Sequence, residues 1–266
     1  MTQAIYTETY IRDPESPWLV FLHGFGGTAE MWKKQIPVFK EKFNLLLLDL
    51  PGHGRSQVGI AEHGAHRFED VADMVVEAIR GHGIEKACFV CLSLGTMVFA
   101  AIQSKYPELV TGAILCGAVA GVSHLMQGWL YLLNSIRHTI PYMFLLRLFA
   151  WILLPKKEHE KSRRFFIKNG KKLGRKEFMA WFSLITHNMT VLKPIIHRLE
   201  NALFISGTED YTFLGKLKAL LRRRHNLRLS LLKRCGHVCN LQLPQEFNSI
   251  SMEFLNENLL PKTGTT

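Results

Sequence analysis

A serine between an apolar run and a helical pattern is the sharpest chemical signal in the sequence. Ser93 stands at the centre of segment 91–95 (CLSLG), directly after the apolar run 87–92. On a tight turn from strand to helix, the hydroxyl is held above the sheet edge, and the next backbone N–H lies at a helix N-terminus that favours developing negative charge. The turn needs small residues two positions before and after the serine. Gly95 fits, and Cys91 is small but carries a Cβ. The string alone is equally typical of a turn without chemical function.

A hydroxyl nucleophile needs a base, and the base needs an acid that orients it. Asp210 and His237 each follow an apolar run in the C-terminal part of the chain. Because parallel strands end at the same edge of a sheet, Ser93, Asp210 and His237 can converge there. Glu209 is the rival for the acid, and we predict Asp210 because it lies one residue deeper in the loop.

A glycine-rich segment follows the first apolar run. Residues 23–27 (HGFGG) allow the backbone to curl so that the N–H of Phe25 faces the space above Ser93. Together with the N–H of Leu94 it would form a two-donor oxyanion hole, in which the loss of one donor typically costs about 3 kcal/mol of transition-state stabilisation. Glycine-rich turns also cradle phosphates, but neither G-x-G-x-x-G nor the P-loop Lys-Ser/Thr is present.

Alternating strands and helices must position these residues. Short apolar runs bounded by turns are typical of strands buried on both faces of a parallel sheet, and apolar residues at helical spacing lie between them. The predicted strands are 18–22, 43–48, 87–92, 109–116, 202–206 and 227–232. The predicted helices are 30–40, 68–79, 94–105, 214–224 and 244–258. Repeated β-α-β units predict an α/β fold with one mostly parallel, doubly wound sheet.

The length of the chain fits one such sheet with a helical insertion. With 266 residues, 47% hydrophobic and 21% charged, the composition excludes a disordered chain and provides a sizeable core. Residues 118–198 carry no strand pattern and are rich in apolar and aromatic side chains up to Leu154. We therefore expect residues 1–117 and 199–266 to form the core and residues 118–198 to form a helical cap (lid). We expect the tail 261–266 to be disordered.

The ordered motifs resemble the α/β-hydrolase superfamily in its single-domain form with a helical cap, similar to carboxylesterases and lipases. Five landmarks spread along nearly the whole chain carry the resemblance: 23–27 (HGFGG), 49–56 (DLPGHGRS), 93–95 (SLG), Asp210 and 236–237 (GH). The resemblance implies that Ser93 is the nucleophile, His237 the base and Asp210 its partner. It also implies that the backbone N–H groups of Phe25 and Leu94 form the oxyanion hole. The N-terminal strand region is shorter than the full hairpin that is usual in this superfamily.

Several other residues look reactive but are expected to be structural. Asp49 and His53 lie in a turn that the superfamily uses as scaffold. Cys88 and Cys91 spell C-x-x-C, but their spacing within a strand points them to opposite faces, whereas a redox pair would lie at a helix start. The loop histidines have no partners at metal-ligand spacing, so we expect no metal and no cofactor.

The expected chemistry is acyl transfer to a serine. A serine nucleophile argues against the dehalogenase and epoxide-hydrolase branches of the superfamily, which use aspartate. We expect a small-molecule carboxylic ester with a medium or long acyl chain, because apolar side chains of the cap would line an acyl pocket. The predicted pocket residues are Trp129, Leu133, Phe144, Phe149 and Trp151. Acyl thioesters, acyl-carrier-protein esters and carbon–carbon bonds suit the same triad, and a hydrolase-fold ligand receptor with little turnover also stays open.

Basic residues gather in one stretch of the expected cap. The chain carries 33 Lys and Arg against 22 Asp and Glu, a formal net charge of +11. Lys156–Lys176 holds ten of the basic residues and two Glu, a net +8. Besides a solvated helix face, this stretch fits two partners, an anionic membrane surface or an acidic carrier protein. No nucleic-acid-binding motif accompanies the charge, so we expect no nucleic acid partner.

The sequence indicates a reducing, cytoplasmic location, with peripheral attachment at a membrane surface as an alternative. Five cysteines are too few and too unevenly spaced for a disulfide framework. Residues 1–10 include Glu8 and lack the apolar core of a signal peptide. The longest apolar run, residues 140–154, contains Arg147 and is shorter than the roughly 20 residues that span a bilayer.

Overall fold

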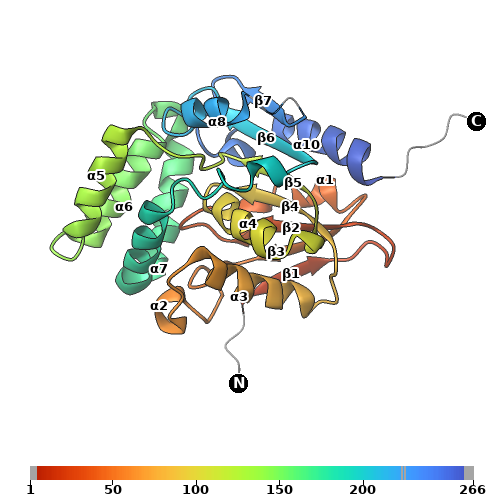
Figure 1. Ribbon diagram of the computed structural model, residues 1–266, viewed down its shortest axis with the longest axis horizontal. Helices are drawn as coiled ribbons and strands as arrows, with labels where there is room; N and C mark the ends of the chain where they lie inside the picture. The colour runs from red at the N-terminus through yellow and green to blue at the C-terminus, as the bar shows by residue number, and fades with distance from the viewer. Residues whose placement is uncertain (1–4, 223, 225, 261–266) are drawn as a thin grey trace, which may run out of the picture.

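One seven-stranded sheet runs through the computed structural model, which describes residues 5–222, 224 and 226–260 (Figure 1). The strands are β1 (Thr7–Tyr10), β2 (Trp18–Leu22), β3 (Asn44–Leu48), β4 (Ala87–Leu92), β5 (Val110–Cys116), β6 (Ala202–Gly207) and β7 (Arg228–Leu232). Their order across the sheet is β1-β3-β2-β4-β5-β6-β7, with β1 antiparallel to β3 and every other neighbouring pair parallel. The predicted mostly parallel sheet is confirmed. The expectation for the tail 261–266 lies outside the described residues.

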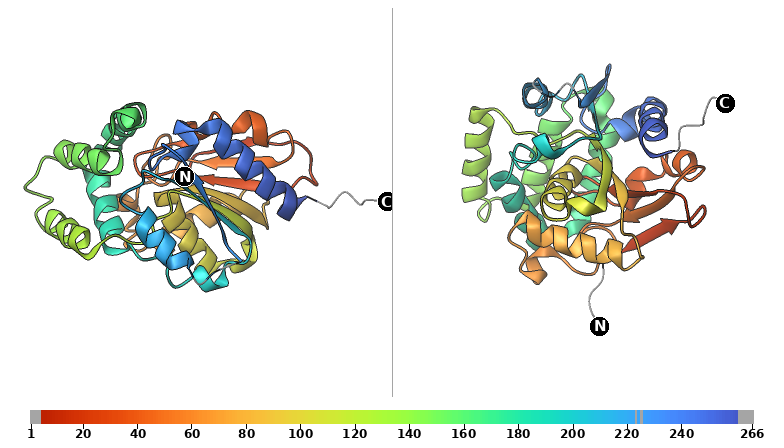
Figure 2. Two further views of the ribbon diagram at one scale, coloured as in Figure 1. Left: turned by 90° about the horizontal axis from the view of Figure 1, so that it is seen from above. Right: turned by 45° about the vertical axis from the view of Figure 1, so that its right-hand side comes forward.

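Helices cover both faces of this sheet, as the doubly wound pattern predicts. The helices of the core are α1 (Ile36–Phe39), α2 (Ile60–His63), α3 (Phe68–Arg80), α4 (Leu94–Lys105), α8 (Leu214–Leu221), α9 (Cys239–Gln242) and α10 (Pro244–Leu259), with 3-10 turns η1 (Ala29–Trp32) and η2 (Pro107–Leu109). Figure 2 shows α1 and α10 on one face of the sheet and α4 and α8 on the other, and α3 packs along α4.

The N-terminal part differs from the sequence predictions in two respects. The prediction of a single helix over 30–40 is wrong, since η1 and α1 are separate short helices. Pro37 lacks the N–H that would bond to the carbonyl of Lys33 in a continuous helix. The edge strand β1 was not predicted, because Thr7–Tyr10 is short, polar and only half-buried. It extends the sheet by pairing with β3.

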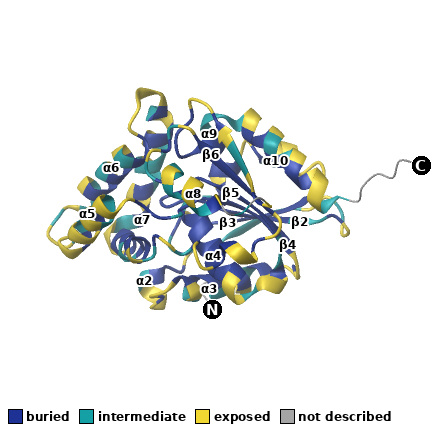
Figure 3. Ribbon diagram, turned by 45° about the horizontal axis from the view of Figure 1, so that its top comes forward, coloured by how far each residue is buried: buried dark blue, intermediate teal, exposed yellow. Residues whose placement is uncertain are grey.

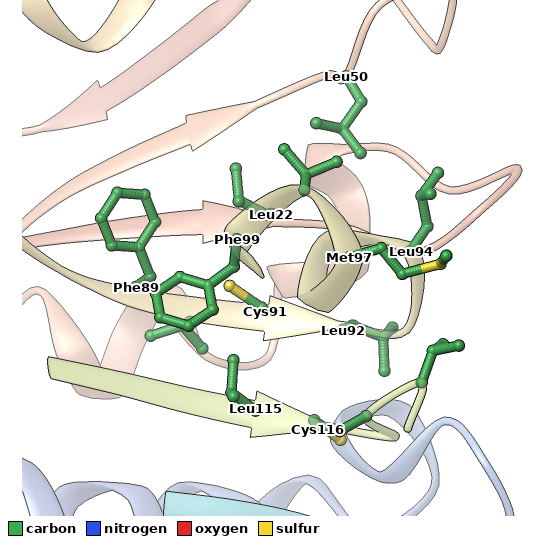
Figure 4. Packing of buried hydrophobic residues seen from close by; sticks show 14 of the residues in the cluster. Leu22, Leu50, Phe89, Cys91, Leu92, Leu94, Met97, Phe99, Leu115 and Cys116 are labelled. Atoms are coloured by element: carbon green, nitrogen blue, oxygen red, sulfur yellow. The ribbon is translucent and has the colours of Figure 1, made fainter. Parts of the chain in front are cut away.

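The core is centred on strands buried on both faces, shown in dark blue in Figure 3. Every residue of β3 and β4 is buried, in agreement with their continuous apolar sequences. Cys91 lies on β4 near Phe99 of α4 and Leu115 of β5 (Figure 4). Cys88 and Cys91 are buried free thiols, and burial raises the pKa of both. This environment fits structural cysteines.

A helical insertion, residues 117–201, separates β5 from β6. It contains α5 (His124–Ser135), α6 (Tyr142–Leu153), η3 (Lys157–His159), α7 (Glu160–His187) and η4 (Ile196–Arg198). The long helix α7 bends at Gly174, whose φ of 77° is outside the helical range, and both α5 and α6 pack against α7. The side chain of Glu177 on α7 accepts the N–H groups of Ile60 (2.7 Å) and Ala61 (3.1 Å) and so ties the insertion to the start of α2. Within the described part of the chain, no helix combines the length and apolarity needed to span a bilayer.

Candidate active site

Ser93 occupies the sharp turn that joins β4 to α4. Its backbone has φ 50° and ψ −111°, a conformation that is costly for a residue with a side chain. Among the described residues only one other non-glycine residue, Arg234, has a positive φ. A Cβ on Gly95 would overlap the carbonyl oxygen of Leu22, and a Cβ on Gly24 would lie 3.3 Å from Cβ of Ser93. Gly95 in this turn and Gly24 in the loop after β2 therefore let the end of β2 approach the serine closely.

The structure brings the side chains of Ser93, His237 and Asp210 together at the carboxyl ends of β4, β7 and β6 respectively. Oγ of Ser93 lies 2.8 Å from Nε2 of His237, and Nδ1 of His237 lies 2.8 Å from Oδ2 of Asp210. Asp210 and His237 are almost entirely shielded from solvent, with 1% and 2% of their surfaces exposed. The other carboxylate oxygen of Asp210 accepts the N–H of Phe213 (3.2 Å), which fixes the orientation of the carboxylate. This geometry suits proton transfer from the serine hydroxyl to the imidazole.

Glu209, the rival acid, faces the helical insertion instead. Its carboxylate contacts Nζ of Lys156 at 2.7 Å and Nε2 of His159 at 3.1 Å. The hydrogen bond from Lys156 lowers the pKa of Glu209. The two neighbouring acids therefore have different partners. Asp210 contacts His237, whereas Glu209 contacts Lys156 and His159 and so links the loop after β6 to η3.

Two segments provide the backbone N–H groups predicted to form the oxyanion hole: the loop after β2, which contains Phe25, and the start of α4, which contains Leu94. The N–H of Gly27 donates to the carbonyl of Gly24 (2.8 Å), which closes the turn that contains Phe25. Leu94 is the first residue of α4, so its N–H has no acceptor inside the helix. The N–H of Phe25 donates no hydrogen bond to any described residue. Phe25, Leu94 and Ser93 line one cavity.

Asp49 and His53 hold the glycine-rich loop in place, which fits their expected structural roles. The carboxylate of Asp49 accepts the N–H groups of Ala29 (2.6 Å) and Arg55 (2.8 Å). Nε2 of His53 accepts the N–H of Gly26, next to Phe25, at 3.1 Å. Burial lowers the pKa of His53 to about 3, so the imidazole is neutral and remains an acceptor.

His23 has a matching structural role that sequence reasoning did not assign. Its Nε2 accepts the N–H of Leu50 at 2.8 Å, and its Nδ1 lies 2.8 Å from the carbonyl oxygen of Gly24. Burial lowers the pKa of His23 to about 4. The only sequence signal was its position beside the glycines, because the partner of Nε2 lies on a different turn.

An apolar cavity of about 40 Å³ adjoins Ser93, and only one of the five predicted pocket residues lines it. Phe149 does so, whereas Trp129, Phe144 and Trp151 are 56%, 57% and 53% exposed and Leu133 is half-buried elsewhere. Those four residues do not line this cavity, and their role in substrate binding stays a prediction. On α6, positions 149 and 153 share the inward face, which puts 144 and 151 on the outer side. The lining residues that sequence analysis missed include Met31, Met97, Val119, Leu153, Leu154, Phe166, Ile185, Met189 and Val238.

Comparisons with known proteins agree with this architecture. Residues 17–150 match the family model described as alpha/beta hydrolase fold. A 2-succinyl-6-hydroxy-2,4-cyclohexadiene-1-carboxylate synthase of Escherichia coli O17:K52:H18 is 37% identical over 111 residues, 42% of this chain and 40% of the relative. An (E)-2-((N-methylformamido)methylene)succinate hydrolase of Acinetobacter baylyi is 28% identical over 118 residues, 44% of each chain. The matched region therefore spans less than half the length of these curated relatives.

Solved structures resemble the whole chain in fold. MenH from S. aureus superposes with a TM-score of 0.80 at 19% identity, covering 98% of this chain and 100% of that one. Est816, described as an N-acyl homoserine lactone degrading enzyme, gives a TM-score of 0.77 at 20% identity, covering 94% and 96%. With the family match over half of its length and a sheet of the same architecture, the chain belongs to the α/β-hydrolase family.

Proposed function

We propose that the protein is a serine hydrolase that cleaves a carboxylic ester with a hydrophobic acyl chain. The observation that carries the proposal is the pair of 2.8 Å contacts that joins Ser93 to His237 and His237 to Asp210. In this proposal, Oγ of Ser93 attacks the ester carbonyl carbon while Nε2 of His237 takes the hydroxyl proton. The N–H groups of Phe25 and Leu94 stabilise the negative charge on the carbonyl oxygen.

The reaction then follows in two stages. The protonated His237 gives its proton to the leaving alcohol, which departs as the carbon–oxygen bond breaks and leaves an acyl ester on Ser93. Water gives a proton to Nε2 of the neutral His237 as its oxygen attacks the acyl carbon. The bond from that carbon to Oγ of Ser93 then breaks, His237 returns the proton to Oγ, and the carboxylic acid is released. Asp210 stabilises the imidazolium that forms in each stage, and its burial keeps this contact free of competing water.

The lining of the cavity favours an apolar acyl group. The names of the two curated relatives describe acidic compounds, a carboxylate with a succinyl group and a succinate. Recognition of such anions usually uses Arg or Lys. The described residues around the cavity include neither, and apart from Ser93 and His237 their side chains are apolar. The lining thus favours an apolar ester over such an acid. Cleavage of a carbon–carbon bond in a similar acid is the second candidate, and sequence similarity is what supports it.

We also propose that residues 118–198 act as a cap over the core formed by residues 1–117 and 199–266. Cavities that enclose a small ligand usually measure about 300 Å³ or more, whereas the cavity at Ser93 measures about 40 Å³. Phe149 and Phe166, from α6 and α7, are part of its wall. An acyl chain of medium length therefore requires these cap residues to move outward.

Turnover of nitrophenyl esters from acetyl to palmitoyl tests the proposed function. We expect activity that rises toward medium chains and disappears in Ser93→Ala. We also expect Phe149→Ala, which enlarges the cavity, to shift the preferred chain length, and Trp151→Ala, on the exposed side of the same helix, to leave it unchanged. Absence of activity with every ester, together with no labelling of Ser93 by a fluorophosphonate, would reject the hydrolase and favour a ligand receptor.

A further inference from the structure

Helix α5 presents a continuous apolar stripe to solvent. Leu125, Trp129, Leu132 and Ile136 follow the spacing i, i+4, i+7, i+11, and their side chains are 76%, 56%, 50% and 40% exposed. This spacing places them on one side of the helix. The residues of α5 include no Asp, Glu, Lys or Arg. A contiguous apolar patch on the surface is typical of a site of interaction with a protein or a membrane.

Helix α6 has two apolar faces. Its inner face carries Phe149 and Leu153, which line the cavity beside Ser93. Its outer face carries Phe144 and Trp151, which are 57% and 53% exposed. Both α5 and α6 pack on α7, and they form the left edge of the molecule in Figures 1 and 3. We call the exposed residues Leu125, Trp129, Leu132, Ile136, Phe144 and Trp151 the outer apolar face.

Basic side chains border this outer apolar face. Arg175, which is exposed, donates to the carbonyl oxygen of His138 in the α5–α6 loop at 2.9 Å. The guanidinium of Arg163 stacks over the ring of Trp151 at 3.7 Å from its centroid, but Arg163 is buried and donates to the carbonyl oxygens of Leu154 and Lys156. Arg147 is exposed on α6 between Phe144 and Trp151. Further exposed bases lie on α7, the helix on which α5 and α6 pack: Lys161, Lys168, Lys171, Lys172 and Lys176.

Acidic side chains are scarce in the same region. The segment 117–201 contains three acids, Glu158, Glu160 and Glu177, apart from Glu200 at its end. Glu160 pairs with Arg164, and Glu177 is buried against α2. Glu158 is exposed, but the segment as a whole carries a strong positive charge, and its complement is an anionic surface.

We propose that the outer apolar face docks on an anionic phospholipid bilayer. Exposed Trp, Phe and Leu side chains would enter the headgroup and upper acyl region, and the neighbouring Lys and Arg would contact lipid phosphates. An acidic carrier protein would pair with the bases, but its acidic surface does not account for the exposed apolar side chains on both α5 and α6. The inner face of α6 lines the cavity, and its outer face would contact the bilayer. Docking would therefore bring the cavity close to the lipid phase in which a hydrophobic ester is dissolved. The docking itself does not depend on hydrolysis.

Co-sedimentation of the full chain with lipid vesicles tests this proposal. We expect binding to vesicles of phosphatidylcholine with phosphatidylglycerol at least about tenfold tighter than to phosphatidylcholine alone, and weaker in high salt. The double variant Trp129→Ser/Leu132→Ser should lose about tenfold or more in binding. The matched control is Ile11→Ser, which should bind as the wild type does. Ile11 is 69% exposed and follows Tyr10, which pairs with Leu45 at the start of β3, whereas the insertion follows the carboxyl end of β5.

Three outcomes would overturn the proposal: equal binding to neutral and anionic vesicles, unchanged binding of the double variant, or binding to an acidic acyl carrier protein without binding to vesicles. Circular dichroism of each variant verifies its fold, and all substituted side chains are exposed, so folding should be preserved. The Ser93→Ala variant should bind vesicles as tightly as the wild type. This separates a failure of docking from a failure of the proposed hydrolase activity.

Discussion

Acidification should destabilise the protein through His53 and His23, long before most surface carboxylates are neutralised. Each imidazole uses Nε2 to accept a backbone N–H, from Gly26 at 3.1 Å and from Leu50 at 2.8 Å respectively. A proton on Nε2 would convert the acceptor into a donor that faces another donor. Burial accordingly lowers the pKa of His53 to about 3 and that of His23 to about 4, from the ordinary 6.5.

The sign and size of the effect follow from these pKa values. Below pH 6.5 the unfolded chain protonates both histidines, whereas the folded chain keeps them neutral down to about pH 4 or 3. The contribution of the two histidines to the free energy of unfolding is therefore fully present above pH 6.5. It falls as the pH decreases, by about 1.4 kcal/mol per pH unit for each histidine. Between pH 6.5 and 4, His23 alone removes about 3 kcal/mol, a large share of the stability of a typical domain.

Urea denaturation followed by circular dichroism, repeated between pH 7.5 and 4.5, measures this dependence. In His53→Gln the amide oxygen can accept the N–H of Gly26 but takes up no proton. We expect the pH slope of its unfolding free energy to be smaller than that of the wild type by about 1.4 kcal/mol per pH unit near pH 5. His82→Gln, at an exposed position, is the control and should keep the wild-type slope. An unchanged slope in His53→Gln would refute the reasoning.

Two further pairs of variants test the turn and the acid. Gly95→Ala should lower the free energy of unfolding by about 2 kcal/mol or more, because its Cβ overlaps the β2 backbone, whereas Gly128→Ala, which meets no neighbour on α5, should raise it by about 0.5–1 kcal/mol. Equal effects in thermal unfolding would contradict this. Asp210→Asn should reduce kcat for ester hydrolysis by about 10⁴-fold through loss of the imidazole partner, and Glu209→Gln should change it far less. The reverse order would assign the role to Glu209.

The sheet was predictable because its central strands are buried on both faces and therefore appear as uninterrupted apolar runs, as in β3 and β4. The edge strand β1 is four residues long with a polar sequence, so its identity depends on pairing with β3 rather than on its own pattern. The break between η1 and α1 had a local signal in Pro37 that outweighs the helical spacing around it.

The convergence of Ser93, Asp210 and His237 was predictable because the sheet topology dictates where parallel strands end. The pocket was not. Whether Phe149 or Trp151 faces the cavity depends on how α6 rotates against α7, and both sides of α6 are apolar, so composition carries no information about direction. The same ambiguity concealed the outer apolar face.

The central claim is that Ser93 forms an acyl-enzyme, and mass spectrometry of the protein quenched during turnover tests it most directly. With a medium-chain nitrophenyl ester, we expect the acyl mass on the peptide that contains Ser93, and no adduct or turnover in Ser93→Ala. Hydrolysis that persists in Ser93→Ala, or an acyl group on any other residue, would contradict the account.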